Sequence, residues 1–232
     1  MNKQIIYEIN VDDSEEYVTY ITHKYDLNLD ELNKVIIPLI NKDDLNSFEW
    51  NIGLICGESG SGKSTVLTNQ FGKPVTPVYD NSKPIICQFP KLEPEKVCEI
   101  LESVGMSSVP VWLHKPNNLS VGEKARLDLA WMLANVEQDK IMVIDEFTST
   151  INREVAKSLA FCLQRYIREN NMKVVISTCH FDMLEFLHPD WIYNLNKRNG
   201  DVVELERMVY LDDYENYPDV DPNDVLSEEM PI

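Results

Sequence analysis

A glycine-rich segment lies between an apolar run and a stretch with helical spacing, and this combination constrains the fold more than any other feature. The apolar run is Gly53–Cys56, and the helical pattern covers Lys63–Gln70. Between them the sequence fits the pattern GxxxxGK[ST], in the order Gly57-Glu58-Ser59-Gly60-Ser61-Gly62-Lys63-Ser64. The glycines allow backbone N–H groups to turn inward around an anion, and the helix directs its positive end to the same place. This context predicts a phosphate-binding loop in an α/β domain, and it disfavours a chance glycine-rich turn.

The residue types of the loop indicate which groups bind which part of a nucleotide. Lys63 supplies a positive charge to the terminal phosphates, and the Ser64 hydroxyl can bind Mg²⁺. Thr65 can reach another phosphate oxygen. We therefore expect residues 57–65 to bind ATP together with Mg²⁺.

Two adjacent carboxylates follow a second apolar run. Ile141–Ile144 is a continuous apolar segment, and Asp145 and Glu146 come directly after it. A buried parallel strand delivers the residues at its carboxyl end to the edge of the sheet where ligands bind. We expect Asp145 to hold Mg²⁺ through water and Glu146 to act as the general base toward the attacking water. The alternative is a solvated acidic turn, which the phosphate loop makes less favourable.

The remaining pattern alternates apolar, strand-like runs with helical ones. This alternation predicts an α/β fold with a largely parallel sheet. We expect further strands at Gln4–Ile9, Tyr17–His23, Pro84–Gln88, Val174–Ser177, Trp191–Leu195 and Val202–Leu205, with a turn at Asn199-Gly200. We expect helices at Asp30–Ile40 (interrupted at Pro38), Pro94–Val104, Val121–Asn135 and Arg153–Glu169.

The formal net charge of -18 is concentrated at the two ends of the chain. Residues 1–50 carry a net charge of -7 and residues 212–232 carry -8, whereas residues 51–211 carry only -3. Such acidity opposes binding to a bare phosphate backbone or to an anionic membrane surface. We expect residues 212–232 to be a mobile acidic tail that either docks on a basic partner or aids solubility.

The cysteines and the absence of targeting signals predict a cytoplasmic protein. No apolar run approaches the roughly 20 residues that span a bilayer, and the first residues show no signal-peptide pattern. Five cysteines are an odd number without a CxxC pair, which favours buried, reduced thiols over disulfides or a metal site. The four histidines show no metal-ligand spacing.

Further motifs make the chain resemble the ATP-binding cassette (ABC) ATPases over roughly residues 45–205. Leu119-Ser120-Val121-Gly122-Glu123, at the start of a helix, resembles the family's LSGGQ signature. Gln88 matches the Q-loop glutamine, and His180, after the run Val174–Cys179, matches the switch histidine. Thr148-Ser149-Thr150-Ile151-Asn152 lies where the family has its D-loop, with Asn152 in place of the usual Asp.

The resemblance implies a split active site in a dimer that sandwiches two ATP molecules. Lys63, Ser64, Gln88, Asp145, Glu146 and His180 of one chain would face the nucleotide, with Gln88 also a Mg²⁺ ligand. Ser120 and Gly122 of the other chain would cap the γ-phosphate, and Glu123, in place of the family's glutamine, would be the third signature residue contributed in trans. Three aromatic residues precede the phosphate loop, and each is expected to belong to the core rather than to stack on adenine: Tyr25, Phe48 and Trp50.

The resemblance also implies a division of the chain and a choice of tasks. Residues 1–44 would be an antiparallel β-rich part and residues 45–211 the ATPase domain, with a reduced helical arm at about 89–135. The segments around Asp145–Ser149, Cys179–Asp182 and Pro189–Trp191 are similar to soluble ABC ATPases that are fused to, or paired with, a GNAT-type acetyltransferase. A soluble ATPase working on a separate partner, acetyltransferase-like or nucleoprotein, is the first hypothesis. A membrane-transporter subunit and a nucleotide-gated module with slow hydrolysis are the alternatives.

Overall fold

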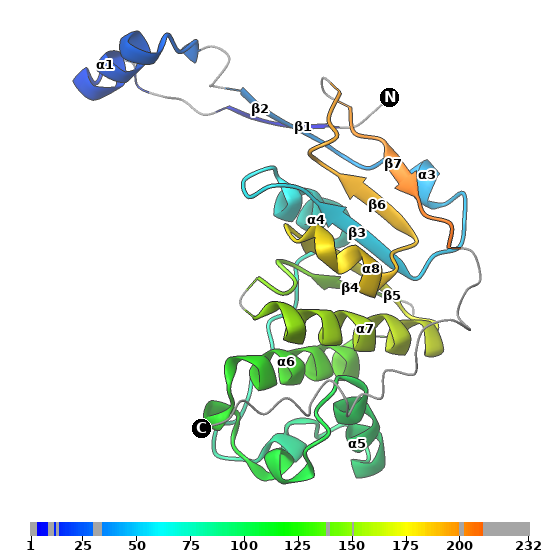
Figure 1. Cartoon of the computed structure of the whole chain (residues 1–232). Helices are drawn as coiled ribbons and strands as arrows, with labels where there is room; N and C mark the ends of the chain where they lie inside the picture. Colours follow the sequence, from blue (N-terminus) through cyan, green and yellow to red (C-terminus); the bar gives the residue numbers. More distant parts are fainter. Residues whose placement is uncertain are drawn as a thin grey trace.

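A five-stranded mixed sheet forms the centre of the protein, in the strand order β4-β5-β3-β6-β7 (Figure 1). The computed structural model describes residues 4–8, 12, 14–29, 34–137, 140–149, 151–199 and 202–210. The strands are β3 (Ile52–Cys56), β4 (Ile141–Ile144), β5 (Lys173–Thr178), β6 (Trp191–Asn194) and β7 (Leu205–Arg207). The first four in the spatial order are parallel, and β7 runs antiparallel to β6. The predicted α/β architecture with a largely parallel sheet is confirmed.

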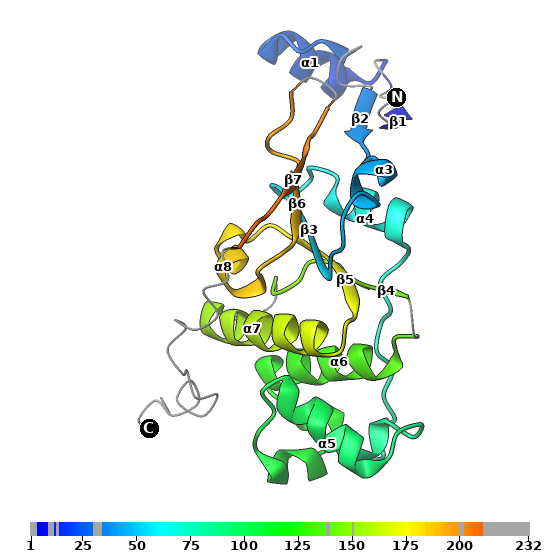
Figure 2. The same cartoon turned by 90° about the vertical axis from the view of Figure 1, so that its right-hand side faces the viewer.

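Helices cover both faces of this sheet because its strands are apolar on both sides. On one face, Leu54 of β3 and Ile176 of β5 pack with α6 (Val121–Asn135) and α7 (Arg153–Glu169). On the other face, Ile55 and Val175 pack with α4 (Lys63–Phe71). Figure 2 shows α7 and α6 stacked as successive layers on the first side. The sheet is thus a rigid platform whose carboxyl-end loops carry the candidate site.

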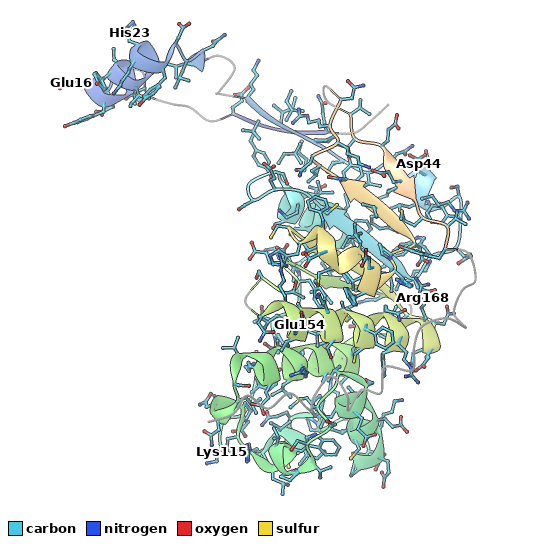
Figure 3. The ribbon with its side chains drawn as sticks, viewed as in Figure 1. Glu16, His23, Asp44, Lys115, Glu154 and Arg168 are labelled. Atoms are coloured by element: carbon cyan, nitrogen blue, oxygen red, sulfur yellow. The ribbon has the colours of Figure 1, made fainter. Side chains whose placement is uncertain are left out.

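A helical region lies beyond α6, at the far end of the molecule from β1 and β2 (Figure 2). It contains α5 (Pro94–Ser103) and two short 3-10 turns, Val109–Leu113 and Pro116–Asn118. Val97, Ile100 and Leu101 form the buried stripe of α5, at the spacing predicted from the sequence. Lys115 marks this end of the molecule in Figure 3.

The N-terminal part projects from the sheet as a two-stranded antiparallel ribbon with a helix (Figure 1). Strands β1 (Gln4–Glu8) and β2 (Lys34–Pro38) pair with Gln4 opposite Pro38. The prediction of a strand at Tyr17–His23 is wrong, since α1 spans Glu16–Tyr25. Lys24 lies 5.4 Å from the ring centre of Tyr20, four residues earlier, a contact that helical spacing creates. Figure 3 shows Glu16 and His23 on this projecting helix.

Three other predicted elements differ from the structure, and some predictions lie outside the described residues. The predicted helix at Asp30–Ile40 is wrong where it can be seen, because β-branched residues at 35–37 pair with β1. The predicted strand Pro84–Gln88 is a 3-10 turn, Ile85–Gln88, in which the N–H of Cys87 donates to the carbonyl of Pro84. The closing strand is β7, three residues later than predicted at Val202–Leu205. Residues 30–33, Thr150, Gly200 and the acidic segment 212–232 lie outside the described residues.

The remaining small elements connect these layers. Helix α3 (Lys42–Leu45) lies between β2 and β3, with Asn41 as its N-cap. A 3-10 turn at Phe181–Met183 leads into α8 (Leu184–Leu187), which packs on α7. Asp44 marks α3 in Figure 3, at the upper right of the view. None of the described helices is long and apolar enough to cross a membrane.

Candidate functional site: a glycine-rich loop, two carboxylates and a histidine

The glycine-rich loop connects β3 to α4, as the sequence predicts (Figure 1). All three of its glycines adopt conformations that L-residues rarely adopt, with φ of 154° at Gly57, 81° at Gly60 and 98° at Gly62. A Cβ atom at Gly57 would lie 2.7 Å from the Oγ of Ser61, so the loop also closes tightly on itself. The chain can therefore turn its backbone N–H groups toward the start of α4, which begins at Lys63.

Lys63 and Ser61 supply the loop with polar groups that fit an anion. Lys63 is 8% exposed, and its Nζ donates to the carbonyls of Gly57 at 3.0 Å and Glu58 at 2.7 Å. Among the described residues, the buried Oγ of Ser61 has no hydrogen-bond partner. A buried, unpartnered hydroxyl costs free energy unless a ligand satisfies it. A phosphate oxygen at the loop supplies such a partner, so the residues present fit this ligand.

The loop meets the carboxylates that follow β4. The Ser64 hydroxyl donates to Asp145 Oδ1 at 3.1 Å, although the two residues are 81 positions apart. A serine hydroxyl and a carboxylate side by side are oxygen ligands of the kind that Mg²⁺ uses beside phosphate groups. Glu146, the next residue, is exposed and has a positive φ of 51°. The fold therefore brings Lys63, Ser64, Asp145 and Glu146 to one edge of the sheet.

His180 follows β5, the strand that lies between β3 and β4. Its Nδ1 lies 3.2 Å from the hydroxyl oxygen of Thr148, and its backbone N–H donates to the Thr178 hydroxyl at 3.0 Å. Burial lowers the pKa of His180, the charge of Arg153 lowers it further, and Asp182 acts in the opposite direction. The imidazole is therefore held in a fixed position and favours its neutral form near neutral pH.

The signature-like segment forms the start of α6 and is closed by its own carboxylate. Ser120 is the N-cap, and its Oγ accepts from the N–H of Glu123 at 3.3 Å. The Glu123 carboxylate accepts from both the N–H and the hydroxyl of Ser120, each at 2.8 Å. Burial is the largest single influence and acts to raise the pKa of Glu123, but these two hydrogen bonds, together with the charges of His114 and Arg126, outweigh it and lower the pKa. Ser120, Gly122 and Glu123 make no described hydrogen bond to Lys63, Asp145 or His180, so the chain does not join these groups within itself.

Gln88 is buried but turned toward its own loop. Its Oε1 accepts from the N–H of Asp80 at 2.9 Å. Its Nε2 donates to the carbonyls of Asp80 at 2.9 Å, Lys83 at 3.1 Å and Pro84 at 3.3 Å. The structure therefore does not bring the Gln88 side chain to Ser64 or Asp145.

The loop that Gln88 closes is also tied to α6. The Tyr79 hydroxyl donates to Asp128 Oδ1 at 2.8 Å, and Lys124 pairs with the same carboxylate. The ammonium of Lys124 lies 4.0 Å from the centre of the Tyr79 ring. The segment carrying Gln88 and the helix carrying Ser120 are thus held together by one polar cluster.

The D-loop candidate reaches α7. Asn152 is the N-cap of α7, where its Oδ1 accepts from the N–H of Val155 at 2.9 Å. Replacement of the usual Asp by Asn therefore keeps the cap of this helix. Thr148 and Ser149 lie between Glu146 and this cap.

The three aromatic residues before the loop lie in different environments. Trp50 is 8% exposed and packs edge-on against Trp191, so its predicted core role is confirmed. Phe48 packs against the core and carries Arg207 over its ring at 4.6 Å. Tyr25 is 60% exposed on α1, so its assignment to the core is wrong. Phe48 and Trp50 line a cavity of about 340 Å³ at the amino ends of the strands, the opposite edge from the glycine-rich loop.

The cysteines are free thiols, but most of them are not buried as predicted. All five cysteines are free, but only Cys56 is buried, and burial raises its pKa to about 12. Cys87 and Cys179 are exposed, so the expected burial is wrong for them. Within the described ranges, no group of three or more His, Cys, Asp or Glu side chains is arranged to hold a metal.

Two residues at the site were missed from the sequence. Ser177, inside β5, donates to Asp145 Oδ1 and accepts from the N–H of Glu146 at 3.0 Å. Asn196, after β6, accepts from the N–H of Glu58 at 2.9 Å. A serine in an otherwise apolar buried strand was the available signal for Ser177; Asn196 stands in a polar turn and carries no such signal.

Comparison with known proteins identifies the fold. No family model matches the chain. The dimeric structure of a post-hydrolysis state of the ATP-binding cassette MJ0796, bound to ADP and Pi, gives a TM-score of 0.54 at 18% identity. It covers 90% of this chain and 99% of that one. The dimeric MJ0796 bacterial ABC transporter cassette gives 0.51 at 20% identity, over 76% of this chain and 94% of that one. The chain has the ABC ATPase cassette fold, as the resemblance implies.

Curated relatives match a shorter part of the chain. The methionine import ATP-binding protein MetN 2 of Acinetobacter baylyi is 31% identical over 102 residues, 42% of this chain and 28% of that protein. The energy-coupling factor transporter ATP-binding protein EcfA1 of Listeria monocytogenes is 36% identical over 112 residues, 47% of this chain and 36% of that protein. MetN 1 of Paraburkholderia xenovorans is 29% identical over 137 residues, 58% of this chain and 38% of that protein. The chain thus spans well under half the length of these relatives, which support an ABC-class assignment.

Proposed function

We propose that the chain is an ABC-type ATPase that hydrolyses ATP to ADP and phosphate. The observation that carries this proposal is the 3.1 Å contact between Ser64 and Asp145, which joins the glycine-rich loop to the carboxylate strand. The buried Lys63 and the unpartnered Ser61 hydroxyl support a phosphate ligand at the same place. ATP-binding proteins among the relatives support the nucleotide.

Each residue of the site has a proposed role in this reaction. Residues 57–65 bind the phosphates through backbone N–H groups, Lys63 and Thr65, while Ser64 and Asp145 hold Mg²⁺. When bound, Mg²⁺ neutralises charge that builds up on the phosphate oxygens. Glu146 accepts a proton from the attacking water, and His180 contacts the γ-phosphate. Gln88 can join the metal only after its hydrogen bonds to the loop at Asp80–Pro84 break.

We further propose that the active site is completed in an ATP-dependent homodimer. Ser120 and Gly122 would cap the γ-phosphate of the partner chain, with Glu123 as their neighbour in the signature segment, and Asn152 would lie near the dimer contact. The side chains of Ser120 and Glu123 make their described hydrogen bonds within this pair rather than with Lys63 or Asp145, which supports the proposal. The dimeric form of the cassettes of the same fold also supports it.

A hydrolysis-deficient variant tests the whole proposal. Glu146→Gln should bind ATP with Mg²⁺ and run as a dimer in gel filtration, while wild type should return to a monomer as ATP is consumed. Lys63→Ala should lose nucleotide binding, because the phosphate charge then has no positive partner. A monomeric Glu146→Gln protein at saturating ATP, or unchanged affinity in Lys63→Ala, would contradict the dimer or the phosphate site respectively.

The partner that uses this ATPase is a separate question with two candidates. The relatives are ATP-binding proteins of import and energy-coupling transporters, which favours a subunit of a membrane transporter. A soluble ATPase with a separate partner, acetyltransferase-like or nucleoprotein, is the second candidate. The short helical region between Gln88 and Ser120, with α5 and two 3-10 turns, favours it. Capture with ATP-trapped Glu146→Gln distinguishes them: a membrane permease supports the first and excludes the second.

The division of the chain is also a proposal. Residues 1–44 would be the β-rich N-terminal part, 45–211 the ATPase domain with its arm at about 89–135, and 212–232 the acidic tail. The separate pairing of β1 with β2 and the continuous core of α5, α6 and α7 support the first two parts. Limited proteolysis with mass spectrometry tests the boundaries.

A further inference from the structure

A serine lies inside one of the buried central strands of the sheet. Ser177 belongs to β5, between β3 and β4, and its side chain is fully buried after the apolar run Val174–Ile176. A buried hydroxyl is costly unless it makes hydrogen bonds. Its partners therefore indicate what the strand gains from a polar residue at this position.

Ser177 holds the three residues that follow β4. Its hydroxyl donates to Oδ1 of Asp145 and accepts from the N–H of Glu146 at 3.0 Å. Its backbone carbonyl accepts from the N–H of Phe147 at 2.9 Å. These contacts fix the turn in which Glu146 adopts a φ of 51°, a conformation that a glutamate rarely takes without support.

The contacts also orient the Asp145 carboxylate. Three donors converge on Oδ1: the Ser177 hydroxyl, the Ser64 hydroxyl at 3.1 Å and the Glu146 N–H at 3.1 Å. Within the described part of the chain, every hydrogen bond to this carboxylate ends on Oδ1. Oδ2 is thereby left as the oxygen that can accept a water molecule of a metal ion.

We propose that Ser177 is a positioning residue of the ATPase reaction, acting on Mg²⁺ through Asp145 and on the attacking water through Glu146. The proposal rests on the function proposed above. A serine that only fills space in β5 would affect stability, whereas a positioning serine affects the Mg²⁺ requirement. The two roles are therefore separable.

Two substitutions separate the hydroxyl from its volume. Ser177→Ala removes the donor and leaves a small void, while Ser177→Cys restores the volume with a weak donor. Ser103→Ala is the control, since it also removes one hydroxyl hydrogen bond, to Ile100 in α5. Each protein is assayed for ATP hydrolysis at varied free Mg²⁺ and for binding of a fluorescent non-hydrolysable ATP analogue with and without Mg²⁺.

We expect both Ser177 variants to need roughly tenfold more free Mg²⁺ for half-maximal activity and for Mg²⁺-dependent binding, as for one lost hydrogen bond to a charged group. Binding without Mg²⁺ should change less than twofold, because the glycine-rich loop is untouched, and Ser103→Ala should match wild type.

A Mg²⁺ requirement within twofold of wild type in Ser177→Cys overturns the proposal, since volume alone then explains the serine. Wild type that binds Mg²⁺-nucleotide but does not hydrolyse it would overturn the proposed function alone, because the binding comparison still decides the role of Ser177. Wild type that binds no nucleotide would overturn both.

Discussion

Thr148 fixes the ring of His180, with its Oγ1 3.2 Å from the histidine Nδ1. Thr148 is 7% exposed and has a φ of 69°, which is unusual for a β-branched residue. Such a conformation persists only where the surrounding structure holds it. The contact leaves the Nε2 side of the ring as the one that can face a γ-phosphate.

Replacing Thr148 by Val should therefore slow ATP hydrolysis. The substitution removes the hydroxyl at nearly constant volume, and a net loss of about 1 kcal/mol predicts roughly a fivefold lower kcat. The KM for ATP should stay unchanged, because the phosphate loop is not altered. Steady-state kinetics measures this, with Thr148→Ser as the control that keeps the hydroxyl. Equal kcat values in Thr148→Val and wild type would contradict it.

The pKa of His180 should respond in opposite directions to its two charged neighbours. Arg153→Gln removes a cation that lowers the pKa and should raise the titration midpoint. Asp182→Asn removes an anion that raises the pKa and should lower the midpoint. The two side chains also pair with each other at 3.3 Å. Imidazole NMR titration of the three proteins measures the shifts, and shifts of the same sign in both variants would refute this assignment.

The same shift predicts a loss of stability at acid pH. Because the pKa is lowered on folding, the folded chain binds fewer protons at His180 than the unfolded chain does. The contribution is complete above the ordinary value of about 6.5 and is lost as the pH falls from there through the lowered pKa of the folded chain. Between neutral and acid pH, the free energy of unfolding should fall less in His180→Gln than in wild type, as measured by urea unfolding at each pH. Parallel pH curves for the two proteins would speak against this linkage.

In the ATP-free protein, Gln88 should stabilise the fold, because its side chain is hydrogen-bonded to its own loop and not to the nucleotide site. Gln88→Ala leaves the carbonyls of Asp80, Lys83 and Pro84 without this donor and should lower the free energy of unfolding by about 2 kcal/mol. Gln88→Glu should be worse, because a carboxylate would then face three carbonyls. Urea denaturation measures both. If Gln88→Ala kept full stability but raised the Mg²⁺ requirement, the metal role would dominate instead.

Glu123 should weaken the proposed dimer as it stabilises α6. Its carboxylate accepts the hydrogen bond of the Ser120 hydroxyl, which a γ-phosphate of the partner chain would have to accept instead. Glu123→Gln keeps a capping residue but removes the negative charge, so ATP-driven dimerisation of Glu146→Gln should strengthen. Sedimentation equilibrium measures the dimer constant. Glu123→Ala, which loses the cap, is the control for stability. Weaker dimerisation in Glu123→Gln would contradict the expected repulsion between the Glu123 carboxylate and the γ-phosphate of the partner chain.

The sequence predicted the sheet and the main helices well where one pattern dominated. Ile141–Ile144 is apolar throughout, as a strand buried on both faces must be, and α7 shows a clear helical stripe. Tyr17–His23 was misread because its aromatic and β-branched residues favour strands, whereas the residues form a helix that lies outside the sheet.

Side-chain direction was the part of the site that the sequence could not provide. The order of the motifs predicted that Lys63, Ser64 and Asp145 lie at one edge of the sheet, since parallel strands end together. It could not show that Gln88 turns back onto its own loop, or that Ser177 reaches across from β5 to Asp145. Both depend on contacts between neighbouring backbones, which no residue spacing encodes.

The projecting helix α1 gives the chain a segment whose sequence the packing of the interior does not constrain. None of its ten residues is buried, so none of them is constrained by the shape of the interior. Substitutions there should accumulate faster during evolution than in α6 or α7. The same property makes α1 a suitable place to insert a peptide tag or attach a fluorophore without disturbing the ATPase cassette.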